Sequence, residues 1–199
     1  VYLGKRRKNV HSPSQVPYII LGTALLWFGW FGFNAGSALG ANLDAVSAFA
    51  NTNFASAAAM IAWIFFDMFN KKKMSATGAC IGAVVGLVAI TPAAGFVTIG
   101  QSIFIGFISA VISWYAVQIK NKSGLDDTLD VFPCHGIGGV SGMILTAVFA
   151  KDVGLVYGET TVFTHHMIAL VCVSVFTFFG SLLLYKIVDL ITPIRVIEE

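Results

Sequence analysis

Charge and cysteine are both scarce in this chain of 199 residues, and each shortage excludes a class of protein. Charged side chains make up only 11% of the sequence, against 57% for hydrophobic ones, a balance that ordinary soluble domains do not show. The three cysteines, Cys80, Cys134 and Cys172, are far apart, and each lies in an apolar run. Their spacing fits neither a metal site nor a disulfide framework. We therefore expect free, buried thiols and no metal or cofactor.

Apolar runs with helical periodicity are abundant, and they predict an all-α polytopic membrane protein. The 20 glycines and 17 phenylalanines suit helices packed closely in lipid, and they argue against the alternating strands of a β-barrel. We predict six transmembrane helices, over residues 17–40, 45–69, 76–91, 97–119, 130–150 and 164–190. The third is about 24 Å long, which is short for a hydrocarbon core of about 30 Å, and Thr91-Pro92 breaks it.

Basic residues mark one side of the predicted membrane domain, residues 17–190. Of the 12 Lys and Arg residues, all but Lys151 lie at the chain ends or in loops on one side: Lys5, Arg6, Arg7, Lys8, Lys71, Lys72, Lys73, Lys120, Lys122, Lys186 and Arg195. Loops rich in Lys and Arg remain in the cytoplasm. We therefore expect a plasma (inner) membrane protein whose basic loop, residues 1–16, and tail start, residues 191–199, are both cytoplasmic. The basic stretch is too isolated to indicate nucleic-acid binding.

The stretch DVFPCHGIGGVSG, residues 130–142, places a histidine inside a predicted span. Ionisable groups at that depth are costly and suggest function by default. The alternative is a histidine hydrogen-bonded between packed helices. Gly138 and Gly142 lie four residues apart and allow another backbone to approach closely. An intramembrane hydrolase using Cys134 and His135 is disfavoured, because adjacent residues of a helix point about 100° apart.

The first predicted span carries aromatic and hydroxyl side chains on one face. Trp30, Phe33 and Ser37 are spaced at i, i+3 and i+7, which places them on the same side of a helix. Such a stripe is more often packing than a binding site. The hydroxyl group adds only a little to the case for a small polar ligand.

Polar clusters stand at the start of each of the last two predicted spans. Asp126, Asp127 and Asp130 precede the histidine helix. Because helix N-termini favour carboxylates, we expect capping here rather than metal binding. His165 and His166 open the last span, where we expect them to be solvated or near lipid headgroups.

Three motifs together resemble the ammonium transporter family (Amt/Mep/Rhesus). They are WFGFNAGS at residues 30–37, TPAAG at 91–95 and DDTLDVFPCHGIGG at 126–139, and the similarity covers essentially the whole chain. The resemblance implies an eleven-helix fold whose first ten helices form an inverted repeat, assembled as a homotrimer. This chain resembles helices six to eleven, the second half of that fold. Because it also opens abruptly, without Met or a signal peptide, we expect an N-terminal half to be missing.

The resemblance also assigns roles to residues by position. His135 matches the second of twin pore histidines, and Val131 an apolar pore-lining position. Trp30 and Ser37 match an outer vestibule that recruits ammonium, and Phe33 one of two gate phenylalanines. Asp130, Asn34 and Thr91 are expected to be structural residues near the pore.

The implied function is ammonium transport through a hydrophobic, histidine-lined pore, with no enzymatic activity. Ammonium or ammonia is the implied substrate, the lipid bilayer is the setting, and a cytoplasmic PII-type regulator is a further partner that the resemblance suggests. An ammonium sensor and a Rhesus-type gas channel remain the alternatives. A sensor would need an appended signalling domain.

The orientation can be tested with single cysteines, after the native ones are replaced. Ser75→Cys and Ser123→Cys should react with an impermeant thiol reagent only from the cytoplasmic side, because lysine-rich loops remain there. Gly158→Cys should react only from outside. Labelling of positions 75 and 158 from the same face would show that the number of spans is wrong.

Overall fold

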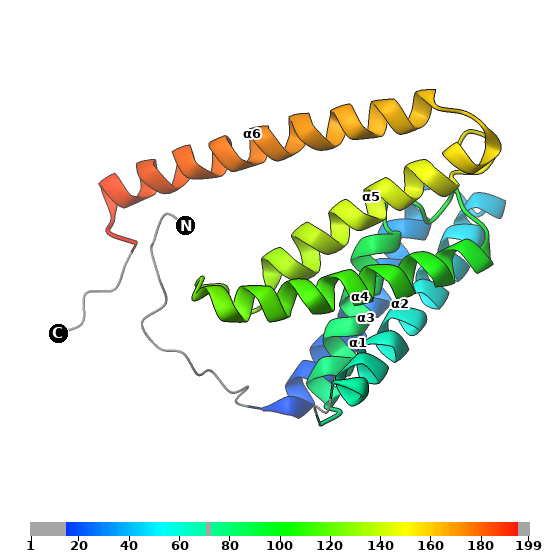
Figure 1. Cartoon of the computed structure of the whole chain (residues 1–199). Coiled ribbons are helices and arrows are strands. Elements are labelled where there is room, and N and C mark those ends of the chain that lie inside the picture. The colour runs from blue at the N-terminus through cyan, green and yellow to red at the C-terminus, as the bar shows by residue number, and fades with distance from the viewer. Residues whose placement is uncertain (1–14, 71–72, 195–199) are drawn as a thin grey trace.

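The computed structural model describes residues 15–70 and 73–194, and its fold is all-helical (Figure 1). The elements are α1 (Val16–Gly36), α2 (Leu43–Phe69), α3 (Ala76–Ile90), α4 (Ile99–Ser123), the π-helical turn η1 (Phe132–Ile137), α5 (Gly138–Phe149), the 3-10 turn η2 (Leu155–Tyr157) and α6 (Thr161–Ile191). The predicted basic loop and tail, together with Lys71 and Lys72, fall mostly or wholly outside the described residues.

The predicted all-α membrane architecture is confirmed. Five segments are long and apolar enough to cross a membrane, among them η1 and α5 taken together. The sixth, α3, has 15 residues, which is about 22 Å of helix. It is short, as the sequence predicts. α3 lies between α2, α4 and α5, so its length need not match the thickness of the surrounding lipid.

The first span ends four residues earlier than predicted, because α1 ends at Gly36 rather than at Gly40. Leu39 then adopts a left-handed backbone conformation, with φ of 53°. Asn42 begins α2 by accepting a hydrogen bond from the backbone N–H of Ala45 at 2.9 Å. A side-chain cap of this kind satisfies a free backbone N–H in the first turn of a helix, so it favours the start of α2 directly after Asn42.

Small residues bring α2, α3 and α4 into close contact. A Cβ atom on Gly106 of α4 would overlap the backbone carbonyl of Ala55, which is completely buried in α2. Gly86 of α3 faces the same part of α2, and Gly142 of α5 lies against the backbone of Ala89. The predicted close approach at Gly142 is therefore confirmed, and van der Waals packing of backbones holds these helices together.

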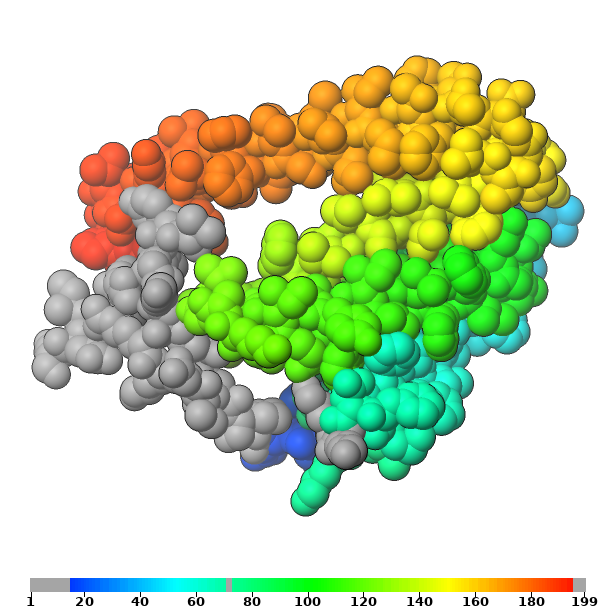
Figure 2. All heavy atoms as spheres, in the orientation of Figure 1, coloured from blue at the N-terminus to red at the C-terminus, as the bar shows by residue number. Residues whose placement is uncertain are grey.

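The two outermost helices, α1 and α6, have almost no buried residues. Asn34 is the only fully buried residue of α1, and α6 has none. α6 follows α5 at one end and then extends beyond the rest of the bundle (Figure 2). This position corrects one expectation, since Cys172 is exposed on α6, whereas Cys80 and Cys134 are free and buried as predicted.

The basic residues of the described segments are divided between the two ends of the bundle. The segment just before α3 and the last turns of α4 and α6 lie toward the lower and left side of Figure 1. These parts of the chain carry Lys73, Lys120, Lys122 and Lys186. The loop that contains Lys151 lies at the right. The helices therefore alternate in the way that the charge pattern requires.

Gly106→Ala tests the close contact between α4 and α2. The added methyl group would meet the Ala55 carbonyl, so the two helices must separate. We expect a loss of roughly 1–3 kcal/mol of stability, measured by thermal unfolding in detergent. The control is Gly100→Ala in the same helix, where a Cβ meets nothing within 4 Å. It should change stability by no more than about 0.5 kcal/mol, and equal losses in both variants would contradict the packing argument.

Candidate functional site

His135 lies in the one π-helical turn of the described residues. Pro133 has no N–H to donate, and the N–H of Gly138 reaches back to the carbonyls of both Pro133 and His135. π-helical turns are rare and occur frequently at functional sites. Because a π-helical turn contains an extra residue, it changes the direction in which the side chains before and after it point.

The turn separates the two residues that a hydrolase would need. Cys134 is buried beside Trp63 and Val85, whereas His135, the next residue, is exposed. Val131 lies four residues before His135 and is 50% exposed. Residues four apart share a helix face, so Val131 and His135 present one apolar and one polar group on the same open surface.

A buried lysine ties the end of α4 to the start of the histidine turn. Lys120 is only 8% exposed, and its Nζ lies 2.6 Å from Oδ1 of Asp130. The same ammonium group donates a hydrogen bond to the backbone carbonyl of Asp127 at 2.9 Å. Asp130 itself has a positive φ of 54°, a conformation that costs free energy for a residue other than glycine. The ion pair holds it there.

The carboxylate of Asp127 caps the same turn. Its two oxygens accept hydrogen bonds from the backbone N–H groups of Val131 and Phe132, at 2.9 and 2.8 Å. The expectation that an aspartate of this cluster caps the histidine helix is thereby confirmed. Lys120, Asp127 and Asp130 together fix where the turn begins, and this sets the position of His135 one turn later.

A second site lies at the C-terminal end of α1. A cavity of about 340 Å³ is lined by Phe33, Asn34, Ser37, Ala38, Asp44, Ala48, Thr91, Ala94, Gly95 and Phe96. Its walls come from the end of α1, the first turns of α2 and the segment that follows α3. Asp44 is its only charged lining residue, so the cavity favours a cation. We call this cavity the outer pocket.

Trp30, Phe33 and Ser37 are brought together, although only Phe33 and Ser37 line the outer pocket. The ring of Trp30 meets that of Phe33 edge to face, with centroids 6.2 Å apart. Its indole N–H donates a hydrogen bond to the Thr91 hydroxyl at 2.8 Å. Ser37 donates its hydroxyl proton to the carbonyl of Phe33 at 2.6 Å, which leaves its oxygen available as an acceptor.

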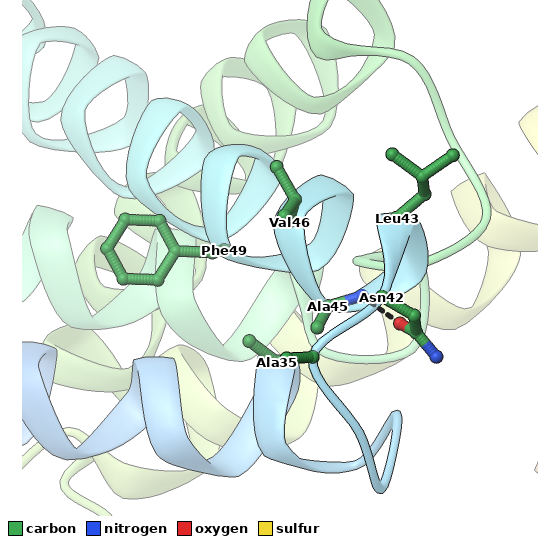
Figure 3. Close-up of a pocket in the computed structure, with 7 residues that line it drawn as sticks. Ala35, Asn42, Leu43, Ala45, Val46 and Phe49 are labelled. Atoms are coloured by element: carbon green, nitrogen blue, oxygen red, sulfur yellow. Dashed lines mark hydrogen bonds between the residues drawn. The ribbon is translucent and has the colours of Figure 1, made fainter.

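A larger cavity of about 600 Å³ lies between the end of α1 and the first turns of α2 (Figure 3). It is lined by Ala35, Ala41, Asn42, Leu43, Ala45, Val46 and Phe49. Asn42 supplies its only polar side chain, and the side-chain carbonyl of Asn42 already accepts from Ala45 N–H. A cavity with so few free polar groups does not suit a cation. The smaller outer pocket is therefore the better binding site.

Comparison with known proteins identifies the family. A sequence model described as "Ammonium Transporter Family" matches residues 1–199. An ammonium transporter of Bacillus subtilis is 46% identical over 208 residues, which cover 100% of this chain and 52% of the relative. One from Aquifex aeolicus is 41% identical, covering 99% of this chain and 48% of the relative. The chain belongs to the ammonium transporter family. It spans about half the length of these curated relatives.

Solved structures of this family have the same fold. The crystal structure of Candida albicans Mep2 matches with a TM-score of 0.89 and 34% identity, over 94% of this chain and 44% of that one. A protein described as "Sensor Amt Protein" matches with a TM-score of 0.83 and 29% identity, over 97% and 49%. The family resemblance read from the three motifs is confirmed, and the relatives are transporters rather than enzymes.

Two site residues were missed by reasoning from sequence. The charge pattern places Lys120 in a lysine-rich loop, and no pattern marks its burial against the aspartates that follow it. Asp44 had a detectable signal, because it occupies the first turn of a helix beside the WFGFNAGS motif. The sequence did not show that this turn folds back toward Ser37.

Lys120→Met tests the contact that positions the histidine turn. Removing one partner of a buried ion pair leaves the other charge uncompensated, so we expect a loss of roughly 3 kcal/mol in a detergent unfolding assay. Adding Asp130→Asn should recover part of that loss. Lys122→Met is the matched control, two residues away and exposed, and should have little effect. Additive losses in the double variant would mean that the two charges do not interact.

Proposed function

We propose that this chain forms part of an ammonium transporter that recruits ammonium at the outer pocket and conducts ammonia past His135. The exposed face shared by Val131 and His135 carries this proposal. It places one titratable group on an otherwise apolar surface. Membership of the ammonium transporter family supplies the substrate class.

The chemistry favours loss of a proton before passage. Moving a bare monovalent cation into an apolar pore costs many kcal/mol, up to roughly tens on a Born estimate. Deprotonating ammonium near neutral pH costs only about 3 kcal/mol. An apolar path therefore admits ammonia and excludes potassium, which has no proton to lose. The imidazole of His135 then gives ammonia, or a separately relayed proton, a polar group along the way.

The outer pocket has the groups that recruitment needs. The carboxylate of Asp44 attracts a cation, and the Ser37 oxygen accepts a hydrogen bond from it. Phe33 also lines this pocket, and its ring would exclude bulk water once further helices cover it. Trp30 contacts Phe33 edge to face, and its N–H is held by Thr91, so its ring supports the Phe33 gate.

The remainder of the pore comes from outside this chain. The chain spans about half the length of its curated relatives, and α1, α6 and the His135 surface are open. A second set of helices covering these surfaces would close the path. We place the assembly in the plasma membrane with the lysine-rich ends in the cytoplasm. A homotrimer and a PII-type regulator rest on the family resemblance alone.

A sensor is the second candidate, because the "Sensor Amt Protein" has a similar fold over 97% of this chain. A sensor would bind ammonium at the outer pocket without sustained passage. The electric current measured on adding ammonium distinguishes a sensor from a transporter, since a transporter that relays a proton gives a continuing current. A Rhesus-type gas channel would pass ammonia with no current.

His135 is tested in an assembled transporter, a chimaera in which this chain replaces the matching part of the Bacillus subtilis relative. His135→Ala should fold but lose most ammonium-evoked current, roughly ten-fold or more, because the polar group of the pore is gone. His135→Glu should admit potassium, since a carboxylate in the lumen favours a permanent positive charge. Wild-type current and selectivity in both variants would mean that His135 only packs between helices and does not act in the pore.

A further inference from the structure

Two adjacent polar residues in the middle of the bundle have no role in the mechanism above. Asn51 and Thr52 of α2 are both completely buried. Neighbouring residues of a helix point about 100° apart, so the two side chains reach different elements. Burial of two such groups is costly unless each is hydrogen-bonded.

Asn51 reaches the irregular segment between α3 and α4. Its side-chain amide donates to the carbonyl of Ala94 at 2.8 Å and to that of Val97 at 2.7 Å. Where a helix is broken in apolar surroundings, its free carbonyls must find donors within the protein. Asn51 supplies two donors at once and fixes the course of this segment.

Thr52 reaches α1 instead. Its hydroxyl accepts a hydrogen bond from the side-chain amide of Asn34 at 2.9 Å and donates its own proton to the carbonyl of Ala48 at 2.6 Å. Asn34 is the one buried residue of α1, so this bond anchors α1 to α2, beside the bond that Trp30 donates to Thr91.

The two anchored elements both contribute to the wall of the outer pocket. The segment that Asn51 holds contributes Ala94, Gly95 and Phe96 to the pocket wall. Phe33, Asn34 and Ser37 belong to the part of α1 that Thr52 holds. Two consecutive residues of one helix therefore hold both of these segments by hydrogen bonds, although neither residue lines the pocket.

We propose that Asn51 and Thr52 form a brace that sets the width of the outer pocket and so its preference for ammonium over the larger methylammonium. This inference rests on the proposed function of that pocket. Both are positioning residues, since neither touches the substrate. Their effect passes through the Ala94–Phe96 wall and through Phe33 and Ser37.

Near-isosteric variants separate hydrogen bonding from packing. Thr52→Val keeps the shape of the side chain and removes the acceptor for Asn34. Asn51→Asp keeps the shape but turns carboxylate oxygens toward the two carbonyls, which now repel them. Asn53→Asp is the matched control, because Asn53 lies in the same helix and is exposed.

Uptake is measured in the assembled transporter, per amount of folded protein. Loss of one such hydrogen bond should raise the apparent KM for ammonium about two- to ten-fold in Thr52→Val, with a smaller change in maximal rate. The ratio of methylammonium to ammonium uptake should rise as well. If maximal rate falls while KM and that ratio stay constant, or if nothing changes, the brace is overturned.

A second measurement does not depend on transport. Cys172 is first replaced by Ser, and Ser37→Cys is introduced as a reporter in the pocket wall. Its rate of reaction with a small cationic thiol reagent should increase in Thr52→Val and in Asn51→Asp, but not in Asn53→Asp. A changed reaction rate in a protein that shows no uptake would uphold the brace and overturn the proposed function. An unchanged rate would overturn the brace, whatever the uptake.

Discussion

Polar groups in this bundle must find partners inside the protein, because lipid offers none. The structure depends on a few side chains that meet this requirement. Lys120 satisfies a carboxylate and a backbone carbonyl where the histidine turn begins. Asn51 does the same for two carbonyls where α3 has been broken. In both places the chain leaves regular α-helix only where a donor is already in position.

The same requirement explains why the irregular segments are the ones proposed to be functional. A regular helix satisfies its own backbone and leaves nothing to direct toward a solute. The π-helical turn at His135 and the segment after α3 both depart from that pattern. Each exposes groups that a continuous helix would hide, and each is held by a buried side chain from a neighbouring helix. Close contacts at Gly106 and Gly142 keep those neighbours near enough to do so.

Much of the fold could be read from the sequence, because long apolar runs, glycines four residues apart and lysine-rich loops are local signals. The cap by Asp127 was predictable for the same reason. The π-helical turn was not, since one extra residue in a turn leaves no periodicity to detect. The partners of Lys120 and of the Trp30 N–H depend on how separate helices pack, which hydropathy does not encode. Exposure of Cys172 likewise depends on whether another helix covers α6, and the apolar pattern alone cannot tell.

The shortness of α3 has an electrical consequence. α3 extends for 15 residues, about 22 Å, against a hydrocarbon core of about 30 Å. The outer pocket opens at its far end, where Thr91 lines the wall. If water fills that pocket, the membrane potential falls mainly across the shorter distance, and the local field is steeper by about a third. An ion in such a pocket has crossed almost none of the voltage, so nearly the whole drop, about 2.3 kcal/mol per elementary charge per 100 mV, lies across the shorter path beyond it. The membrane potential therefore acts on the step that follows binding rather than on binding itself.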